Sequence, residues 1–257
     1  MPVADVNGTR LWYDVVGENG TPMVFVPGLG CTHTMYHPQV AEFRGTNRVI
    51  TMDLRGNGES GGLDAPIDGV LALQCRDIAA LLDLLNIEKA VFVGVSYGGV
   101  ILQQFVHMFP ERVKGLVITD SFCDTKVTSV GLGTLIAVNL TFTYYIAPEK
   151  LGQMTEKAYL KWPLAAQEMK KAMIEMRKKE TVLQRKAINR IRFLPYLPEI
   201  TAPTLAVVGE NMALLMKTMK QISSGIPGAR LVVLPDSQDP SNLCQPDRYN
   251  GILRAFL

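Results

Sequence analysis

Histidine is scarce in this chain. Only His33, His37 and His107 occur among the 257 residues, and none follows position 107. Histidine is the side chain that most often transfers protons near neutral pH. Acid–base chemistry in the C-terminal part of the chain therefore needs another residue type, or one of these three histidines brought close by folding.

Other absences exclude whole classes of protein. The four cysteines are widely spaced and form no CxxC pair, which favours buried, reduced thiols over a disulfide framework. The formal net charge is only +2 and no long charged run occurs, so nucleic acid is not an expected partner. His33 and His37 have i, i+4 spacing but no third ligand accompanies them, so we expect no metal and no other cofactor.

No segment has the composition of a membrane anchor. The most apolar window, residues 130–146, is interrupted by Gly131, Gly133 and Asn139 and is too short and too polar to span a bilayer. The N-terminal residues lack the charged-then-apolar pattern of a signal peptide. We therefore expect a cytoplasmic protein with no membrane partner.

Short apolar runs alternate with amphipathic segments over most of the chain. Residues 3–16 alternate apolar and polar side chains around Asn7-Gly8, which predicts a β-hairpin. Continuous apolar runs of the type found in strands buried on both faces follow at 23–26, 48–53, 90–93, 115–120, 203–209 and 230–234. Segments with the periodicity of amphipathic helices lie between these runs. The pattern predicts an α/β fold with a mostly parallel sheet flanked by helices.

This alternation stops between residues 123 and 198. The stretch contains no convincing strand, whereas 149–162, 164–179 and 180–193 have the periodicity of amphipathic helices. We therefore predict a core domain formed by residues 1–122 and 199–257, with a helical cap over 123–198 inserted after the sixth strand.

The stretch Gly94-Val95-Ser96-Tyr97-Gly98 carries the clearest chemical signal. It follows a strand-like run and precedes a helix-like segment, 100–107, so it forms a sharp turn that presents the serine hydroxyl. Glycine is needed at both ends of the motif because a Cβ there would clash where the strand and helix backbones approach each other.

With two further motifs, this stretch resembles the α/β-hydrolase superfamily. Pro27-Gly28-Leu29-Gly30 is similar to the oxyanion loop of that family, and the Asp53–Ser60 segment, DLRGNGES, is similar to a loop of its small esterases and lactone hydrolases. The resemblance implies that Ser96 is a nucleophile activated by a histidine and an acid. It also implies that the backbone N–H groups of Leu29 and Tyr97 form the oxyanion hole.

Two of the three catalytic positions depart from the pattern of that family. The resemblance places the histidine at the position of Asp239, and the acid at the position of Met212. An ordinary aspartate, with a pKa of about 3.9, is a poor base for an alcohol and is shorter than histidine, although burial would raise its pKa. His33, Asp120 and Glu210 are the candidates to replace the missing groups.

Large apolar residues are frequent in the predicted cap. Together with Phe122 and Met212 they predict an apolar pocket over Ser96, and hence a small apolar molecule as the ligand. The lysines of the cap are expected to lie on its solvated outer surface.

Three functions are compatible with these residues. The first is hydrolysis of small carboxylic esters with a non-standard or impaired triad, which we favour. The second is cofactor-free proton transfer of the lyase or isomerase type with Asp239 as the base, an activity that would survive Ser96→Ala. The third is a non-catalytic relative that binds an apolar ligand beneath the cap.

Overall fold

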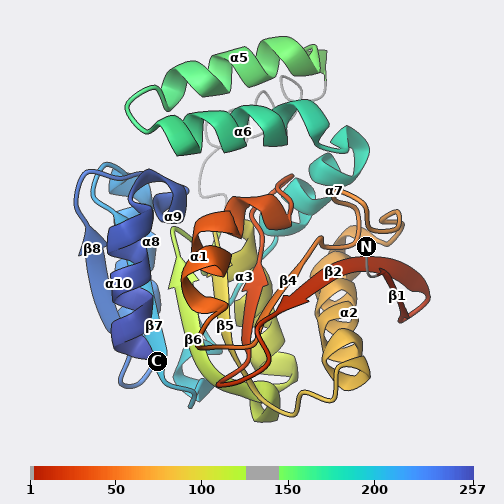
Figure 1. The fold of residues 1–257 in the computed structure, drawn as a ribbon, viewed down its shortest axis with the longest axis vertical. Helices are drawn as coiled ribbons and strands as arrows, with labels where there is room; N and C mark the ends of the chain where they lie inside the picture. Colours follow the sequence, from red (N-terminus) through yellow and green to blue (C-terminus); the bar gives the residue numbers. More distant parts are fainter. Residues whose placement is uncertain (1–2, 126–144) are drawn as a thin grey trace.

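An eight-stranded sheet forms the centre of the molecule (Figure 1). The computed structural model describes residues 3–125 and 145–257. The strand order is β1-β2-β4-β3-β5-β6-β7-β8, with β2 antiparallel to β1 and β4 and all other neighbours parallel. The strands are β1 (Val3–Val6), β2 (Thr9–Val16), β3 (Met23–Val26), β4 (Val49–Met52), β5 (Ala90–Val95), β6 (Val113–Thr119), β7 (Thr204–Gly209) and β8 (Arg230–Leu234).

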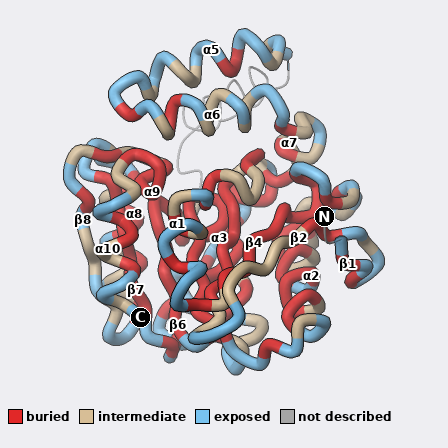
Figure 2. Tube along the Cα trace, viewed as in Figure 1, coloured by how far each residue is buried: buried red, intermediate tan, exposed pale blue. Residues whose placement is uncertain are grey.

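Alternate residues of the strands supply two hydrophobic clusters, one on each face of the sheet. In β3, Val24 and Val26 belong to one cluster, and Met23 and Phe25 belong to the other, because successive side chains of a strand point to opposite faces. Both clusters are enclosed, as the buried central strands in Figure 2 show. The helices that cover the first face are α2 (Val70–Leu84), α3 (Tyr97–Met108) and α8 (Ala213–Gly225); those on the second are α1 (His37–Phe43) and α10 (Pro246–Phe256). The predicted parallel sheet flanked by helices is confirmed.

Three helices lie between β6 and β7 in the described part of the chain: α5 (Pro148–Ala158), α6 (Pro163–Glu175) and α7 (Lys178–Ile188). Helices α5 and α6 pack on each other above the sheet, and α7 packs on α2 (Figure 1). Residues 126–144 of the predicted cap lie outside the described residues, and the division into core and cap stays a prediction. Short elements complete the fold, namely α9 (Ser241–Cys244) and 3₁₀ turns at His33–Tyr36, Ile67–Gly69, Pro110–Arg112 and Leu197–Glu199.

The boundary between α6 and α7 differs from the prediction of one helix over 164–179. Helix α6 ends at Glu175 because Met176 and Arg177 adopt extended backbone conformations. The Arg177 guanidinium donates to the carbonyl oxygen of Ser60 at 2.8 Å, which fastens this break to the core. The break lets α7 run in a new direction beside the carboxyl ends of the strands.

Four loops at the carboxyl ends of parallel strands carry four of the predicted site residues. Leu29 follows β3, Ser96 follows β5, Asp120 follows β6 and Asp239 follows β8. Ligands of open parallel sheets bind at this edge. The fold thus gathers residues that are far apart in the sequence.

Two expectations about the chain as a whole can be compared with the structure. All four cysteines are buried and unpaired, as predicted. Within residues 3–125 and 145–257, no helix combines the length and the hydropathy that crossing a bilayer requires.

Candidate active site

Ser96 occupies a strained turn between β5 and α3. Its backbone has φ 54° and ψ −113°, a left-handed conformation that is rare for residues other than glycine. A Cβ on Gly94 would lie 2.6 Å from the Gly98 backbone, and a Cβ on Gly98 would lie 2.0 Å from the Val26 carbonyl oxygen. Both glycines are therefore sterically required, as the sequence predicted.

Two backbone N–H groups beside Ser96 are available to a ligand. Among the described residues, the N–H groups of Leu29 and Tyr97 have no hydrogen-bond acceptor. Tyr97 is the first residue of α3, where a backbone N–H has no partner within the helix. Its buried phenol donates to Gln74 Oε1 at 2.6 Å, which holds the start of the helix in place. The arrangement suits an oxyanion between the two N–H groups.

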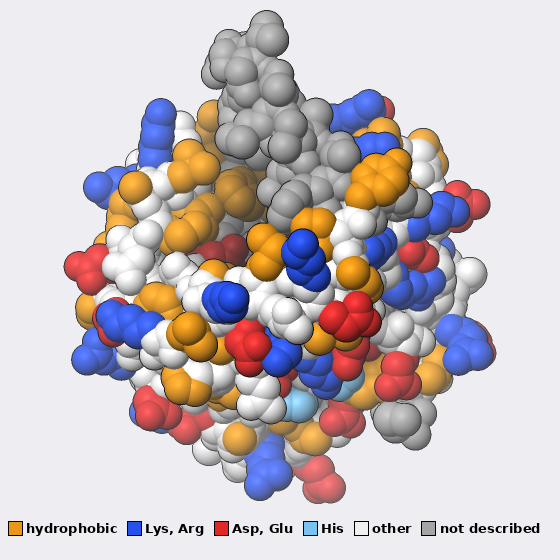
Figure 3. Space-filling model, turned by 90° about the horizontal axis from the view of Figure 1, so that it is seen from above, with side chains coloured by type: hydrophobic (Ala, Val, Ile, Leu, Met, Phe, Trp, Pro, Cys, Tyr) orange, Lys and Arg blue, Asp and Glu red, His pale blue; other side chains and the backbone are white. Residues whose placement is uncertain are grey.

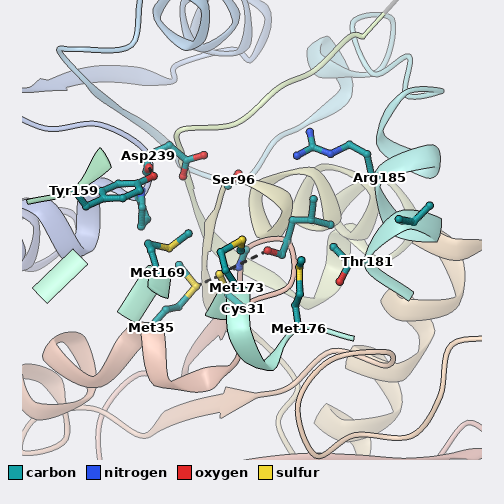
Figure 4. A pocket seen from close by; sticks show the side chains of 14 residues that line it. Cys31, Met35, Ser96, Tyr159, Met169, Met173, Met176, Thr181, Arg185 and Asp239 are labelled. Carbon is teal, nitrogen blue, oxygen red and sulfur yellow. Dashed lines mark hydrogen bonds between the residues drawn. The ribbon is translucent and has the colours of Figure 1, made fainter. Parts of the chain in front are cut away.

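A cavity of about 180 Å³ lies in front of Ser96 (Figure 4). Methionine is the most frequent residue type of its described wall, with Met35 from the 3₁₀ turn His33–Tyr36, Met169 and Met173 from α6, and Met176 directly after α6. Methionine side chains adapt to ligands of different shape. The other described lining residues are Gly28, Leu29, Cys31, Ser96, Tyr159, Thr181, Val182, Arg185, Asp239 and Pro240. Seen from above, hydrophobic side chains border a hollow on this face (Figure 3).

Asp239 lies in the loop after β8, and its carboxyl group points into the cavity beside Ser96 (Figure 4). The Tyr159 hydroxyl donates to the backbone carbonyl of Asp239 and fixes this loop against the end of α5. Burial raises the pKa of the Asp239 carboxyl to about 8, and the charge of Asp120 adds to the rise. A hydrogen-bonding interaction with the Ser96 side chain and the charge of Arg185 act in the opposite direction. Asp239 therefore lies beside Ser96 on the cavity wall and is far more basic than an exposed aspartate.

Asp120 is fully buried behind Asp239. Its two carboxylate oxygens accept the backbone N–H groups of Gly209 and Ser241, each at 2.8 Å. Burial raises the pKa of Asp120, while hydrogen bonds from Ser241 and Gly209 lower it. Backbone N–H groups can only donate, so both bonds favour the ionised form. We conclude that Asp120 keeps the negative charge of this pair and that Asp239 takes up the proton. Asp120 is not among the described residues that line the cavity.

His33 lies outside the cavity wall. Its Nδ1 is 2.9 Å from Asp53 Oδ1, its backbone N–H donates to the same oxygen at 2.8 Å, and its ring stacks on Trp12 with centroids 3.6 Å apart. These contacts hold the ring on Asp53, so the structure does not bring His33 to Ser96. His37 is exposed, and so is His107, whose ring contacts that of Tyr196 in a tilted arrangement.

The remaining predicted site residues also lie away from the cavity. Glu210 is exposed and accepts the backbone N–H of Asp236 at 3.1 Å, so it faces that loop rather than Ser96. Phe122 and Met212 are half-buried and pack on the hydrophobic cluster beneath α3 and α8. Neither is among the described residues of the cavity wall, because both side chains pack on that hydrophobic cluster instead.

Arg185 is a cavity residue that the sequence analysis did not single out. It projects from α7 toward Ser96, on the side opposite Asp239 (Figure 4). Burial lowers the pKa of its guanidinium, whereas the charge of Asp239 raises it. Thr181, Val182 and Arg185 share one helical face, with spacings i, i+1 and i+4. That spacing was visible in the sequence, but the direction of the face was not.

The fold and the geometry of the Ser96 turn agree with a comparison against protein families. The model described as alpha/beta hydrolase fold matches residues 21–243, which is most of the chain. The protein belongs to the α/β-hydrolase fold family. Membership of the family is therefore supported by the match over most of the chain of this α/β hydrolase, and not by the 94–98 motif alone.

Similar proteins carry the names of several hydrolases. A protein of Azorhizobium caulinodans named as a carbamate hydrolase, RutD, is 26% identical over 100% of this chain and 98% of its own length. The 3-oxoadipate enol-lactonase 1 of Acinetobacter baylyi is 44% identical over 32% of this chain and 30% of its own. The crystal structure of the enol-lactonase from Burkholderia xenovorans LB400 superposes with a TM-score of 0.85, at 24% identity over 99% of both chains. The last comparison shows that the fold is shared.

Proposed function

We propose that this α/β hydrolase cleaves small carboxylic esters or lactones through Ser96, with Asp239 in place of a catalytic histidine. The observation that carries the proposal is the Asp239 carboxyl group, which faces Ser96 in the cavity and whose pKa is raised to about 8. A general base works best when its pKa lies near the operating pH. An aspartate with this pKa binds a proton more strongly than a histidine with its ordinary pKa of about 6.5, and it is ionised to a useful extent from neutral pH upward.

In the proposed acylation, the Asp239 carboxylate takes the proton of Ser96 Oγ while Oγ bonds to the carbonyl carbon of the ester. The negative charge that develops on the carbonyl oxygen is stabilised by the N–H groups of Leu29 and Tyr97. When the intermediate collapses, the bond to the leaving oxygen breaks and protonated Asp239 gives it the proton. An acyl group remains on Ser96.

Deacylation uses the same groups, with water as the nucleophile and Ser96 Oγ as the leaving group. Asp239 removes a proton from a water molecule, the water oxygen bonds to the acyl carbon, and the bond to Ser96 Oγ breaks as Oγ regains its proton. The products are a carboxylate and an alcohol, or a hydroxy acid from a lactone. No cofactor takes part in this scheme.

The similar proteins support hydrolysis in general terms. Proteins named as a carbamate hydrolase and an epoxide hydrolase match nearly the whole chain, and one named as an enol-lactonase matches about a third of it, so the bond cleaved differs among them. An ester or lactone is our choice because the unpaired N–H groups of Leu29 and Tyr97 suit a carbonyl oxygen. We also propose a cytoplasmic location, since four buried, unpaired thiols fit a reducing compartment.

A second candidate is proton transfer on a substrate held in the same cavity. It is favoured by the position of Asp239 on the cavity wall, where its carboxyl group can meet an acidic C–H without help from Ser96. In this scheme Ser96 only donates a hydrogen bond. Asp239→Asn would abolish the activity and Ser96→Ala would leave it.

Acyl transfer from 4-nitrophenyl acetate tests the proposal. We expect a burst of 4-nitrophenolate and a mass increase of one acetyl group on a peptide that contains Ser96. Ser96→Ala should lose both signals, and Asp239→Asn should slow the burst by about 100-fold or more. If wild-type protein gives neither a burst nor an acetylated peptide, the hydrolase proposal is wrong.

A further inference from the structure

Arg185 differs from the arginines that flank α7 because, within the described residues, its guanidinium has no hydrogen-bonding or ion-pair partner. By contrast, Arg177 pairs with Glu180 at 2.7 Å and Arg190 pairs with Asp68 at 2.8 Å. Arg185 is half-buried, and withdrawing a charged group from water without a partner is costly, so proteins pair such groups or use them to bind ligands.

Asp239 does not fill the role of partner. The two side chains interact through their charges but lie on opposite sides of Ser96 and form no ion pair (Figure 4). Protonation removes the charge of Asp239 over much of the neutral range, because its pKa is raised to about 8. The guanidinium then has no anion within the described part of the cavity.

We propose that Arg185 binds a carboxylate group of the substrate, so that the substrate is an ester or lactone that carries a second, anionic carboxyl group. The guanidinium presents planar N–H donors that match the two oxygens of a carboxylate. The reacting carbonyl lies at Ser96, and the hydrocarbon chain between the two groups contacts Met173 and Met176. The inference depends on the proposed function for the identity of the reacting group.

This substrate class differs from the small apolar molecule expected from the sequence. The methionine side chains of the cavity wall suit the hydrocarbon part of the ligand, as expected for an apolar molecule, but they do not account for a charged group. Arg185 adds a charged end, and a neutral ligand would leave that end desolvated and unpaired.

Binding to a Ser96→Ala variant tests the inference without turnover. Monomethyl glutarate has one ester carbonyl and one carboxylate, and dimethyl glutarate is its neutral counterpart. By titration calorimetry, we expect monomethyl glutarate to bind at least about 10-fold more tightly, the ratio that a charged hydrogen bond provides. Arg185→Met in the same background should remove this preference, and Arg185→Lys should retain part of it.

Lys186→Gln is the matched control, because Lys186 is an exposed cation on the same helix. It should leave the preference for monomethyl glutarate unchanged. Equal binding of the two glutarates, or a preference that survives Arg185→Met in a folded variant, would overturn the inference. If carboxylate binding depends on Arg185 but the wild-type protein shows no acylation of Ser96, the carboxylate-binding role of Arg185 stands and the proposed ester hydrolysis fails.

Discussion

Arg185 and Asp239 approach Ser96 from opposite sides of one cavity, Arg185 from α7 and Asp239 from the loop after β8 (Figure 4). The charge of Arg185 lowers the pKa of Asp239, and burial together with Asp120 raises it. Burial is the main cause of the basicity of Asp239, and two residues that are distant from it in the sequence, Asp120 and Arg185, adjust it in opposite directions. Each of them can be changed separately.

Arg185→Met should move the pH–rate profile to higher pH. Loss of the guanidinium removes an interaction that lowers the pKa of Asp239, so that pKa rises and less carboxylate is present at pH 7. With the neutral substrate 4-nitrophenyl acetate, we expect a several-fold lower kcat/KM at pH 7 and recovery at high pH. Lys186→Gln should leave the profile in place, and a downward shift for Arg185→Met would disagree with the assigned roles.

Asp239→His should strengthen hydrolysis. Histidine has an ordinary pKa of about 6.5, so the rise of kcat/KM with pH should move from about 8 to near that value. At pH 7 we expect an increase of about 10-fold or more with 4-nitrophenyl acetate, because a larger fraction of the base is then unprotonated. An Asp239→His variant slower than wild type at every pH would argue for proton transfer by the carboxylate itself.

Asp239→Asn should stabilise the protein at alkaline pH. The pKa of Asp239 is raised from 3.8 to about 8 in the folded state, so the native protein binds a proton that the unfolded chain has lost. In the wild-type protein, this proton binding contributes its full stabilisation below about pH 4, and the contribution disappears as the pH rises toward 8. Asparagine does not titrate, so above pH 8 the variant should have a higher Tm than the wild type, and the difference should shrink as the pH falls toward 4.

Thermal unfolding at several pH values measures this effect. The exposed Asp64 offers the control variant Asp64→Asn, which should follow the wild-type curve. A difference between wild type and Asp239→Asn that does not change with pH would rule out the raised pKa as its cause.

Asp120→Asn should lower both stability and the pH midpoint. An asparagine side chain has one oxygen acceptor, so one of the N–H groups of Gly209 and Ser241 loses its partner, at a cost of about 1–3 kcal/mol. Loss of the negative charge also lowers the pKa of Asp239. We expect a lower Tm and a pH–rate midpoint below that of the wild type. A midpoint that stays fixed while Tm falls would limit Asp120 to a structural role.

The sequence predicted the features that depend on local chain geometry. The Gly94–Gly98 turn is specified by steric contacts between residues close in the chain and the adjacent strand β3. Strands and helices followed from periodicity, and the exception was the break at Met176 and Arg177. At that break Arg177 donates to the carbonyl oxygen of Ser60, which is more than a hundred residues away in the sequence, and local periodicity does not reveal so distant a contact.

The electrostatics of the site could not be predicted in the same way. A pKa near the usual aspartate value made Asp239 look like a poor base, because its burial and its neighbour Asp120 are consequences of the folded structure. His33 was a candidate base only until the structure placed Asp53 beside it. Arg185 resembled any other cation of a helix until α7 was oriented toward the cavity.

The rate of Ser96 acylation as a function of pH tests the central claim most directly. With 4-nitrophenyl acetate under single-turnover conditions, the account predicts that acylation rises about tenfold per pH unit and levels off near pH 8. It also predicts that Asp239→Asn removes this dependence and that Ser96→Ala abolishes acylation. Acylation of Asp239→Asn at the wild-type rate, or a midpoint far below 8 in the wild type, would contradict a Ser96–Asp239 pair.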